Sequence, residues 1–85
     1  MSILKVSIRQ VKAARSLLGW SQDRLASASR VSEPTIKRLE ANDGELGGRR
    51  ETAAKIVGAL EKAGVEFTNG DAPGVRLTRP KRKGR

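Results

Sequence analysis

One stretch of the chain decides the fold: it runs from Ser21 to Glu40 and reads SQDRLASASRVSEPTIKRLE. Ser21 and Ser32 are each expected to cap a helix, because a serine hydroxyl can accept a hydrogen bond from a free amide of the first helical turn. Pro34 falls inside the first turn after Ser32, where its missing N–H costs little. The two caps therefore predict two short helices joined by a tight turn.

The apolar residues of this stretch indicate how the two helices pack. Both helices and the turn contribute to the set, which consists of Leu25, Ala26, Val31, Ile36 and Leu39. These side chains are buried together only if the two helices cross steeply. The spacing is that of a helix-turn-helix.

A family resemblance is carried by residues within and around this stretch. They are Gly19, Trp20, Ser21, Gln22, Leu25, Ala26, Val31, Ser32, Ile36, Leu39 and Glu40. In this pattern the chain resembles the helix-turn-helix of the Cro and phage-repressor (XRE-type) class of bacterial DNA-binding proteins, over about Val11 to Gly64. One position departs from the family pattern. The family usually has Gly in the turn, in a left-handed conformation, whereas this chain has Arg30, at a cost of about 1 kcal/mol.

Further helices are predicted on both sides of the motif. Ser7 and Gln10 have the form of a capping box, so a helix is expected from Ile8 to Leu18, ended by Gly19. Trp20 is expected to pack on Arg24 or Leu25. Another helix is expected over 51–63, with a glycine at position 64 as its stop.

The sequence changes period after this last helix. Residues 65–68 and 75–78 alternate apolar and polar around a cluster of turn formers, which predicts a β-hairpin with Val65, Phe67, Val75 and Leu77 on one face. The predicted fold is therefore mainly α. It is a four- to five-helix, lambda-repressor-like helix-turn-helix domain over residues 1–78 with a C-terminal hairpin, followed by a basic disordered tail over 79–85.

The composition restricts the function. The 85 residues carry 18 Lys and Arg against 9 Asp and Glu, a formal charge of +9 that favours a polyanionic partner such as nucleic acid. Without Cys or His, the chain lacks the usual groups for nucleophilic catalysis and metal binding, so we expect no enzyme and no cofactor. No apolar run reaches the length of a signal peptide or a membrane span, and a cytoplasmic protein is expected.

The resemblance implies which residues would read DNA bases. These are residues on the outer side of the second motif helix and its cap: Ser32, Glu33, Pro34 and Arg38. Thr35, which also faces outward or sideways, is added as a further candidate. Arg38 is the leading candidate, because its forked donors match O6 and N7 of guanine. Glu33 can accept from a cytosine amino group, although a favourable charge at a helix N-terminus is an equally simple interpretation. Pro34 or Thr35 can touch a thymine methyl group.

Other residues are candidates for the DNA backbone or for support. Candidate phosphate contacts are Ser21, Gln22, Lys37, Asn42, Arg49 and Arg50, and for Lys37 a solvated surface role competes evenly. The basic tail carries Arg79, Lys81, Arg82, Lys83 and Arg85, which either follow the DNA backbone or only keep the chain soluble. By the same resemblance, Arg15 and Glu40 form a structural salt bridge between the first helix and the second motif helix.

These observations favour a sequence-specific regulator of transcription, in particular a repressor. It is expected to bind an inverted repeat in double-stranded DNA as a homodimer, with the hairpin as the dimer contact. No membrane or small-molecule partner is indicated. Two rival functions stay open. One is a protein-binding antitoxin or anti-activator that uses the same fold as a scaffold, and the other is RNA binding without sequence preference.

Overall fold

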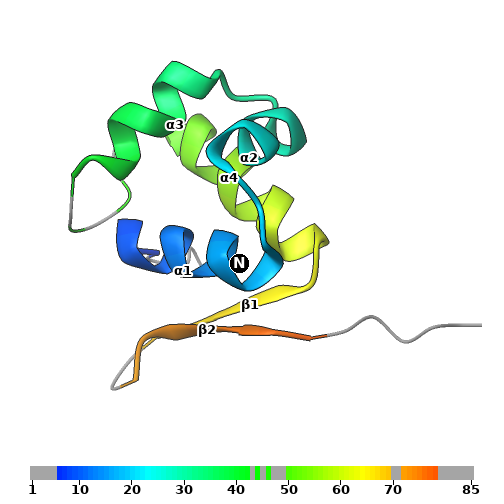
Figure 1. Ribbon diagram of the computed structural model, residues 1–85. Coiled ribbons are helices and arrows are strands. Elements are labelled where there is room, and N and C mark those ends of the chain that lie inside the picture. The colour runs from blue at the N-terminus through cyan, green and yellow to red at the C-terminus, as the bar shows by residue number, and fades with distance from the viewer. Residues whose placement is uncertain (1–5, 43, 45, 47–49, 70–71, 79–85) are drawn as a thin grey trace, which may run out of the picture.

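A computed structural model describes residues 6–42, 44, 46, 50–69 and 72–78. In this part of the chain four helices are followed by a two-stranded antiparallel hairpin (Figure 1). The elements are α1 (Ile8–Leu18), α2 (Gln22–Ser29), α3 (Glu33–Glu40), α4 (Arg50–Lys62), β1 (Val65–Thr68) and β2 (Gly74–Leu77). A mainly helical chain with a C-terminal hairpin is therefore confirmed. The predicted basic tail lies outside the described residues.

Helix α1 has the bounds and the caps that the sequence predicted. The hydroxyl of Ser7 accepts a hydrogen bond from the Gln10 amide at 3.1 Å, and the Gln10 side chain accepts one from the Ser7 amide at 2.9 Å. Gly19 ends the helix in the left-handed conformation, with φ of 71°. A capping box and a glycine stop thus fix both ends of α1.

The caps of α2 and α3 also match the prediction. The hydroxyl of Ser21 accepts from the Arg24 amide at 3.0 Å, and that of Ser32 accepts from the Thr35 amide at 3.3 Å. Helix α2 ends at Arg30, which has φ of 63° and is the one non-glycine residue with positive φ in the part of the chain that the structure describes. The predicted left-handed turn is therefore confirmed.

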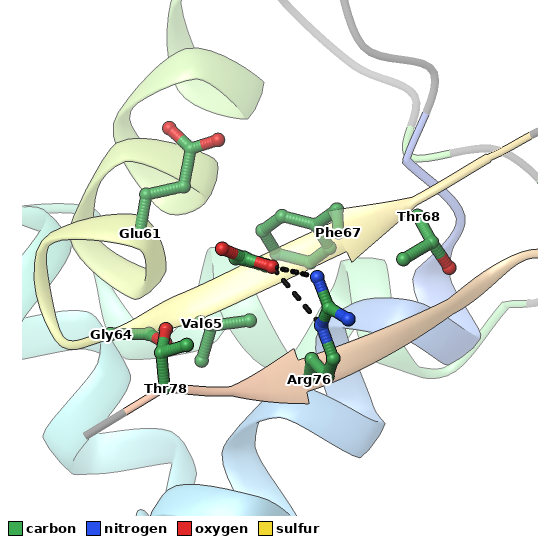
Figure 2. Close-up of a pocket in the computed structure, with 8 residues that line it drawn as sticks. Glu61, Gly64, Val65, Phe67, Thr68, Arg76 and Thr78 are labelled. Carbon is green, nitrogen blue, oxygen red and sulfur yellow. Dashed lines mark hydrogen bonds and ion pairs between the residues drawn. The ribbon is translucent and has the colours of Figure 1, made fainter.

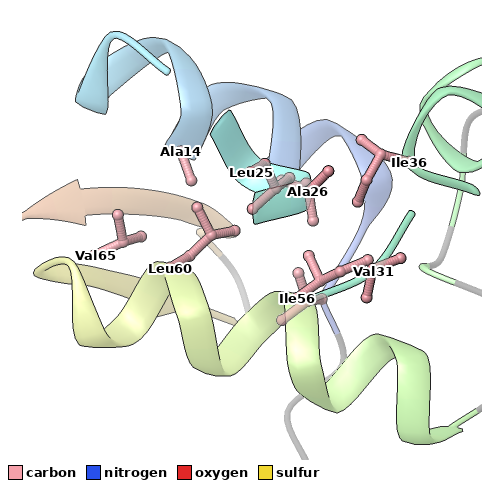
Figure 3. Close-up of a cluster of buried hydrophobic side chains, with 10 residues drawn as sticks. Ala14, Leu25, Ala26, Val31, Ile36, Ile56, Leu60 and Val65 are labelled. Carbon is pink, nitrogen blue, oxygen red and sulfur yellow. The ribbon is translucent and has the colours of Figure 1, made fainter. Parts of the chain in front are cut away.

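The core is built from one side of each helix and from β1. Helix α4 begins at Arg50 and ends at Lys62, one residue earlier at each end than predicted. Its Ile56 and Leu60 are almost fully buried, and they face the residues of α1, α2 and α3 across the core (Figure 3). The buried cluster contains Val6, Val11, Ala14, Leu25, Ala26, Val31, Ile36, Ile56, Leu60 and Val65.

The hairpin has the predicted apolar face. In its register Val65 pairs with Leu77, and Phe67 pairs with Val75, which places all four side chains on one side of the sheet. This face is not buried evenly along its length, because Val65 is 2% exposed whereas Leu77 is 40% exposed. The end of β2 therefore leaves an apolar side chain open to solvent.

One link between α1 and the hairpin was not predicted. The side-chain amide of Gln10 is buried and donates to the carbonyl oxygens of Thr68 at 2.8 Å and Gly74 at 2.9 Å. The same side chain that caps α1 thus holds the two strands where the hairpin opens into its turn. None of the described helices has the length and apolar character that crossing a membrane requires.

Candidate functional site

The two sides of α3 differ in burial and in chemistry. On its inner side Ile36 is 1% exposed, Leu39 is half-buried against the core, and Glu40 is buried. The outer side and the cap are polar apart from Pro34. Four of these residues are exposed, namely Ser32, Pro34, Lys37 and Arg38. The other two, Glu33 and Thr35, are half-buried. All the predicted base-reading residues therefore lie on one accessible surface.

Hydroxyl groups at the start of α3 are held by the cap. Besides accepting from the Thr35 amide, the Ser32 hydroxyl donates to Oγ1 of Thr35 at 2.9 Å. The bond between the two hydroxyl groups uses one of their two protons. The other proton stays available, because each hydroxyl group carries one donor and two acceptor sites. The pair can thus still donate one hydrogen bond to a ligand.

Charged side chains on the outer side of α3 are held weakly. Lys37 lies 3.8 Å from Glu33 one helical turn away, and their side chains are 61% and 40% exposed. An exposed pair of this kind contributes less than about 0.5 kcal/mol, so either partner can exchange it for another contact. Within the described residues the Arg38 guanidinium makes no hydrogen bond or ion pair, and it is exposed. Arg38 is therefore accessible with all of its donors.

The inner side of α3 is fixed by the carboxylate of Glu40. Arg15 of α1 donates to its two oxygens from Nη2 at 2.6 Å and from Nε at 2.8 Å, and Nη1 of Arg15 reaches the Trp20 carbonyl oxygen at 2.9 Å. Gln22 at the start of α2 donates to the same carboxylate at 3.0 Å. The predicted pair of Arg15 and Glu40 is confirmed, and it joins three helices rather than two.

The protonation of this pair follows from its surroundings. Burial on its own would raise the pKa of Glu40, but the hydrogen bonds from Arg15 and Gln22 and the charges of Arg15 and Lys12 outweigh it. The pKa of Glu40 therefore lies below its usual value. The hydrogen bond to Glu40 raises the pKa of Arg15, against a smaller opposing effect of burial. Both groups are charged at neutral pH.

The predicted phosphate contacts lie in different settings. Ser21 is exposed at the α2 cap, and the side-chain amide of Gln22 is turned toward Glu40. The exposed Asn42 donates from Nδ2 to the Arg38 carbonyl oxygen at 3.2 Å, which caps the last turn of α3. Arg50 is exposed at the start of α4. Arg49 and the tail residues Arg79, Lys81, Arg82, Lys83 and Arg85 lie outside the described residues.

The sequence interpretation did not count Arg24 among the candidate contacts. Its guanidinium lies over the Trp20 ring, 5.1 Å from the ring centre, which confirms the predicted packing between these residues. The stacking holds an exposed positive charge in the first turn of α2, close to the Ser21 cap. The spacing of four residues between Trp20 and Arg24 was the signal available in the sequence.

A second feature is a hollow on the outer face of the hairpin, of about 500 Å³ (Figure 2). The charged groups that line it are Glu61, Glu66 and Arg76. Nη2 of Arg76 pairs with Glu66 at 2.5 Å, whereas Glu61 has no ion pair with any residue that the structure describes. The hairpin lies at the end of the molecule away from α3 (Figure 1). In the chain as described, no three Asp or Glu side chains gather into a possible metal site.

Comparison with models of known protein families found no match to this chain. Comparison with curated proteins found no match either.

Proposed function

We propose that α2 and α3 form a helix-turn-helix and that the protein is a sequence-specific DNA-binding regulator of transcription, acting as a repressor. One observation carries the proposal. The outer side of α3 is polar, accessible and rich in hydrogen-bonding groups, whereas its inner side is fixed by Ile36 and by the buried carboxylate of Glu40. A rigid helix with a free polar side is suited to reading base edges in the major groove.

Four residues on the outer side of α3 would each have a counterpart on DNA. Arg38, with all its donors accessible, would bind O6 and N7 of one guanine, a pairing worth about 1–3 kcal/mol of discrimination. Glu33 would give up its weak pair with Lys37 to accept from a cytosine amino group. Thr35 would form a hydrogen bond to a base edge or touch a thymine methyl group, and Pro34 offers an apolar surface beside it.

Backbone phosphates would be bound at the start of α2. The free amides of a first helical turn attract anions, and the Ser21 cap lies there. Arg24 adds a positive charge that Trp20 holds in place. Gln22, held by Glu40, would brace this end of α2 against α3. In this arrangement α2 positions the protein and α3 specifies the sequence.

We further propose that the protein binds as a homodimer through the edge of β2 that faces away from β1. The Thr78 amide donates to the Gly64 carbonyl oxygen at 2.7 Å. Hydrogen-bonded and non-hydrogen-bonded residue pairs alternate along an antiparallel ladder, so the Arg76 amide, two residues earlier, also points toward β1. The amides of Val75 and Leu77 then point the other way, to an edge that a second copy can pair with. The exposed side chain of Leu77 supports the same location.

The test is selection from a random pool of DNA duplexes at near-physiological salt. Wild type, Arg38→Ala and Lys55→Ala are compared, because Lys55 is an exposed charge on α4, outside α3. We expect wild type and Lys55→Ala to enrich one inverted repeat, and Arg38→Ala to lose the preference for one G·C pair in each half-site. If wild type enriches nothing and its binding disappears as salt rises, the proposal fails. A protein-binding role such as an antitoxin would then be the next hypothesis.

A further inference from the structure

Arg30 has a strained backbone conformation, and no contact of its side chain with a described residue compensates for the strain. With φ of 63° and ψ of 34° it lies in the left-handed region, where a side chain crowds its own backbone and glycine does not. The turn itself needs only the backbone of this residue. The Arg30 and Val31 amides both donate to the Ala26 carbonyl oxygen, at 2.8 and 3.2 Å.

The side chain of Arg30 is exposed and unpaired. Across the described residues its guanidinium makes no hydrogen bond, ion pair or ring contact. The acidic residue nearest in sequence, Glu33, lies beside Lys37 instead. A residue that breaks a local rule without a compensating contact in its own chain indicates a role outside that chain.

The place of Arg30 in the fold suggests the partner. It lies two residues before Ser32, the cap of the helix that would enter the major groove. The groove is about 12 Å wide and a helix with its side chains is about 10–12 Å across, so the flanking backbone lies within reach of a long side chain beside the helix end.

We propose that the Arg30 guanidinium binds a phosphate of the DNA backbone and anchors the end of α3 that enters the groove. The inference rests on the proposed DNA-binding function and adds a contact to it. A phosphate contact positions the protein but does not read the sequence, so its contribution is the same for every duplex.

The test is Arg30→Gly, which removes the side chain and relieves the backbone. Thermal unfolding is followed together with binding to the selected repeat and to a scrambled duplex, over a series of salt concentrations. We expect the melting temperature to rise by about 4 °C. Affinity for both duplexes should fall about fivefold or more, and the slope of log K against log salt should flatten by about 0.9 per protomer, as expected for one lost phosphate contact.

Two further variants separate a local contact from net charge. Arg30→Lys keeps the charge and should retain most of the affinity, whereas Lys55→Ala removes an equal charge on α4 and should leave the slope nearly unchanged. The inference is overturned if Arg30→Gly binds like wild type, or if Arg30→Gly and Lys55→Ala weaken binding equally. If wild type binds both duplexes alike but Arg30→Gly still flattens the slope, the phosphate contact stands and sequence-specific recognition fails.

Discussion

The carboxylate of Glu40, the last residue of α3, accepts two hydrogen bonds from the guanidinium of Arg15 in α1, at 2.6 and 2.8 Å. Two parallel bonds fix orientation as well as distance, because the planar donor and acceptor must be aligned. A third bond, from Gln22 to Oε1, ties the start of α2 to the same carboxylate. This buried ion pair and the packing of Ile36 in the core together set the direction in which α3 presents its outer side.

Removal of this carboxylate should destabilise the protein. We expect Glu40→Gln to lower the free energy of unfolding by about 3 kcal/mol, since Arg15 is left without its partner in a largely buried site. Urea unfolding measures the loss. Glu66→Gln is the matched control, because its pair with Arg76 is exposed and should be worth about 1 kcal/mol or less. Equal losses in the two variants would contradict the structural role of Glu40.

The same pair should make stability depend on acid. Because the pKa of Glu40 is lower in the folded protein, the unfolded chain binds more protons once the pH falls to the ordinary pKa of Glu, about 4.5. The stability from this group is complete above that pH and is lost as the pH falls through the folded pKa. The free energy of unfolding of wild type should therefore fall more steeply with decreasing pH than that of Glu40→Gln. Parallel curves for the two proteins would refute this assignment.

The Gln10 side chain should control how firmly the hairpin is held. Gln10→Glu keeps the oxygen that caps α1 but replaces the amide that donates to Thr68 and Gly74. Two carbonyl oxygens would then lose their donor and face a carboxylate. We expect a loss of about 2–3 kcal/mol. Hydrogen exchange should quicken most at the amides of β1 and β2. If the exchange rates rise uniformly over the whole chain, Gln10 does not act on the hairpin in particular.

Features set by neighbouring residues were predictable from the sequence. The caps at Ser7, Ser21 and Ser32 depend on side chains and backbone within a few residues, and all three were predicted. The left-handed conformation of Arg30 was predicted from the family resemblance instead, since a non-glycine residue gives no local signal for it. The outward position of Arg38 follows from helical periodicity alone. What Arg38 touches is a separate matter, because periodicity determines exposure and not a partner.

Contacts between distant residues were predictable only where the family resemblance supplied them. The pair of Arg15 and Glu40 was predicted in this way, whereas the bond from Gln22 to Glu40 was not. The bonds from Gln10 to Thr68 and Gly74 span 58 and 64 residues, and no local pattern indicates them. They arise only after the hairpin has packed on α1.

Two glycines should respond in opposite ways to alanine. Gly58 lies inside α4, is exposed, and has nothing within 4 Å of an added Cβ, so Gly58→Ala should stabilise the protein by about 0.5–1 kcal/mol. Gly64 has φ of 107°, and an added Cβ would lie 2.7 Å from the Thr78 carbonyl oxygen. Gly64→Ala should therefore destabilise the turn into β1. Thermal unfolding of both variants tests this prediction. Melting temperatures that shift in the same direction for both variants would contradict it.

The edge of β2 that faces away from β1 can be blocked without breaking the hairpin. Leu77→Pro removes an amide that points away from β1, and proline is tolerated at such an edge. If two copies pair through β2, light scattering should find wild type as a dimer and this variant as a monomer. Its circular dichroism should stay close to that of wild type.

Two controls show which part of the edge matters. Leu77→Thr keeps the amide and should still dimerise, with lower affinity because the exposed apolar side chain is gone. Arg76→Pro removes the amide that pairs with β1 and should loosen the hairpin itself, since that hydrogen bond belongs to the sheet. A monomeric wild type at high concentration, with and without DNA, would rule out the dimer. Two half-sites would then have to be bound by independent copies, and the affinity for a repeat would show no cooperativity.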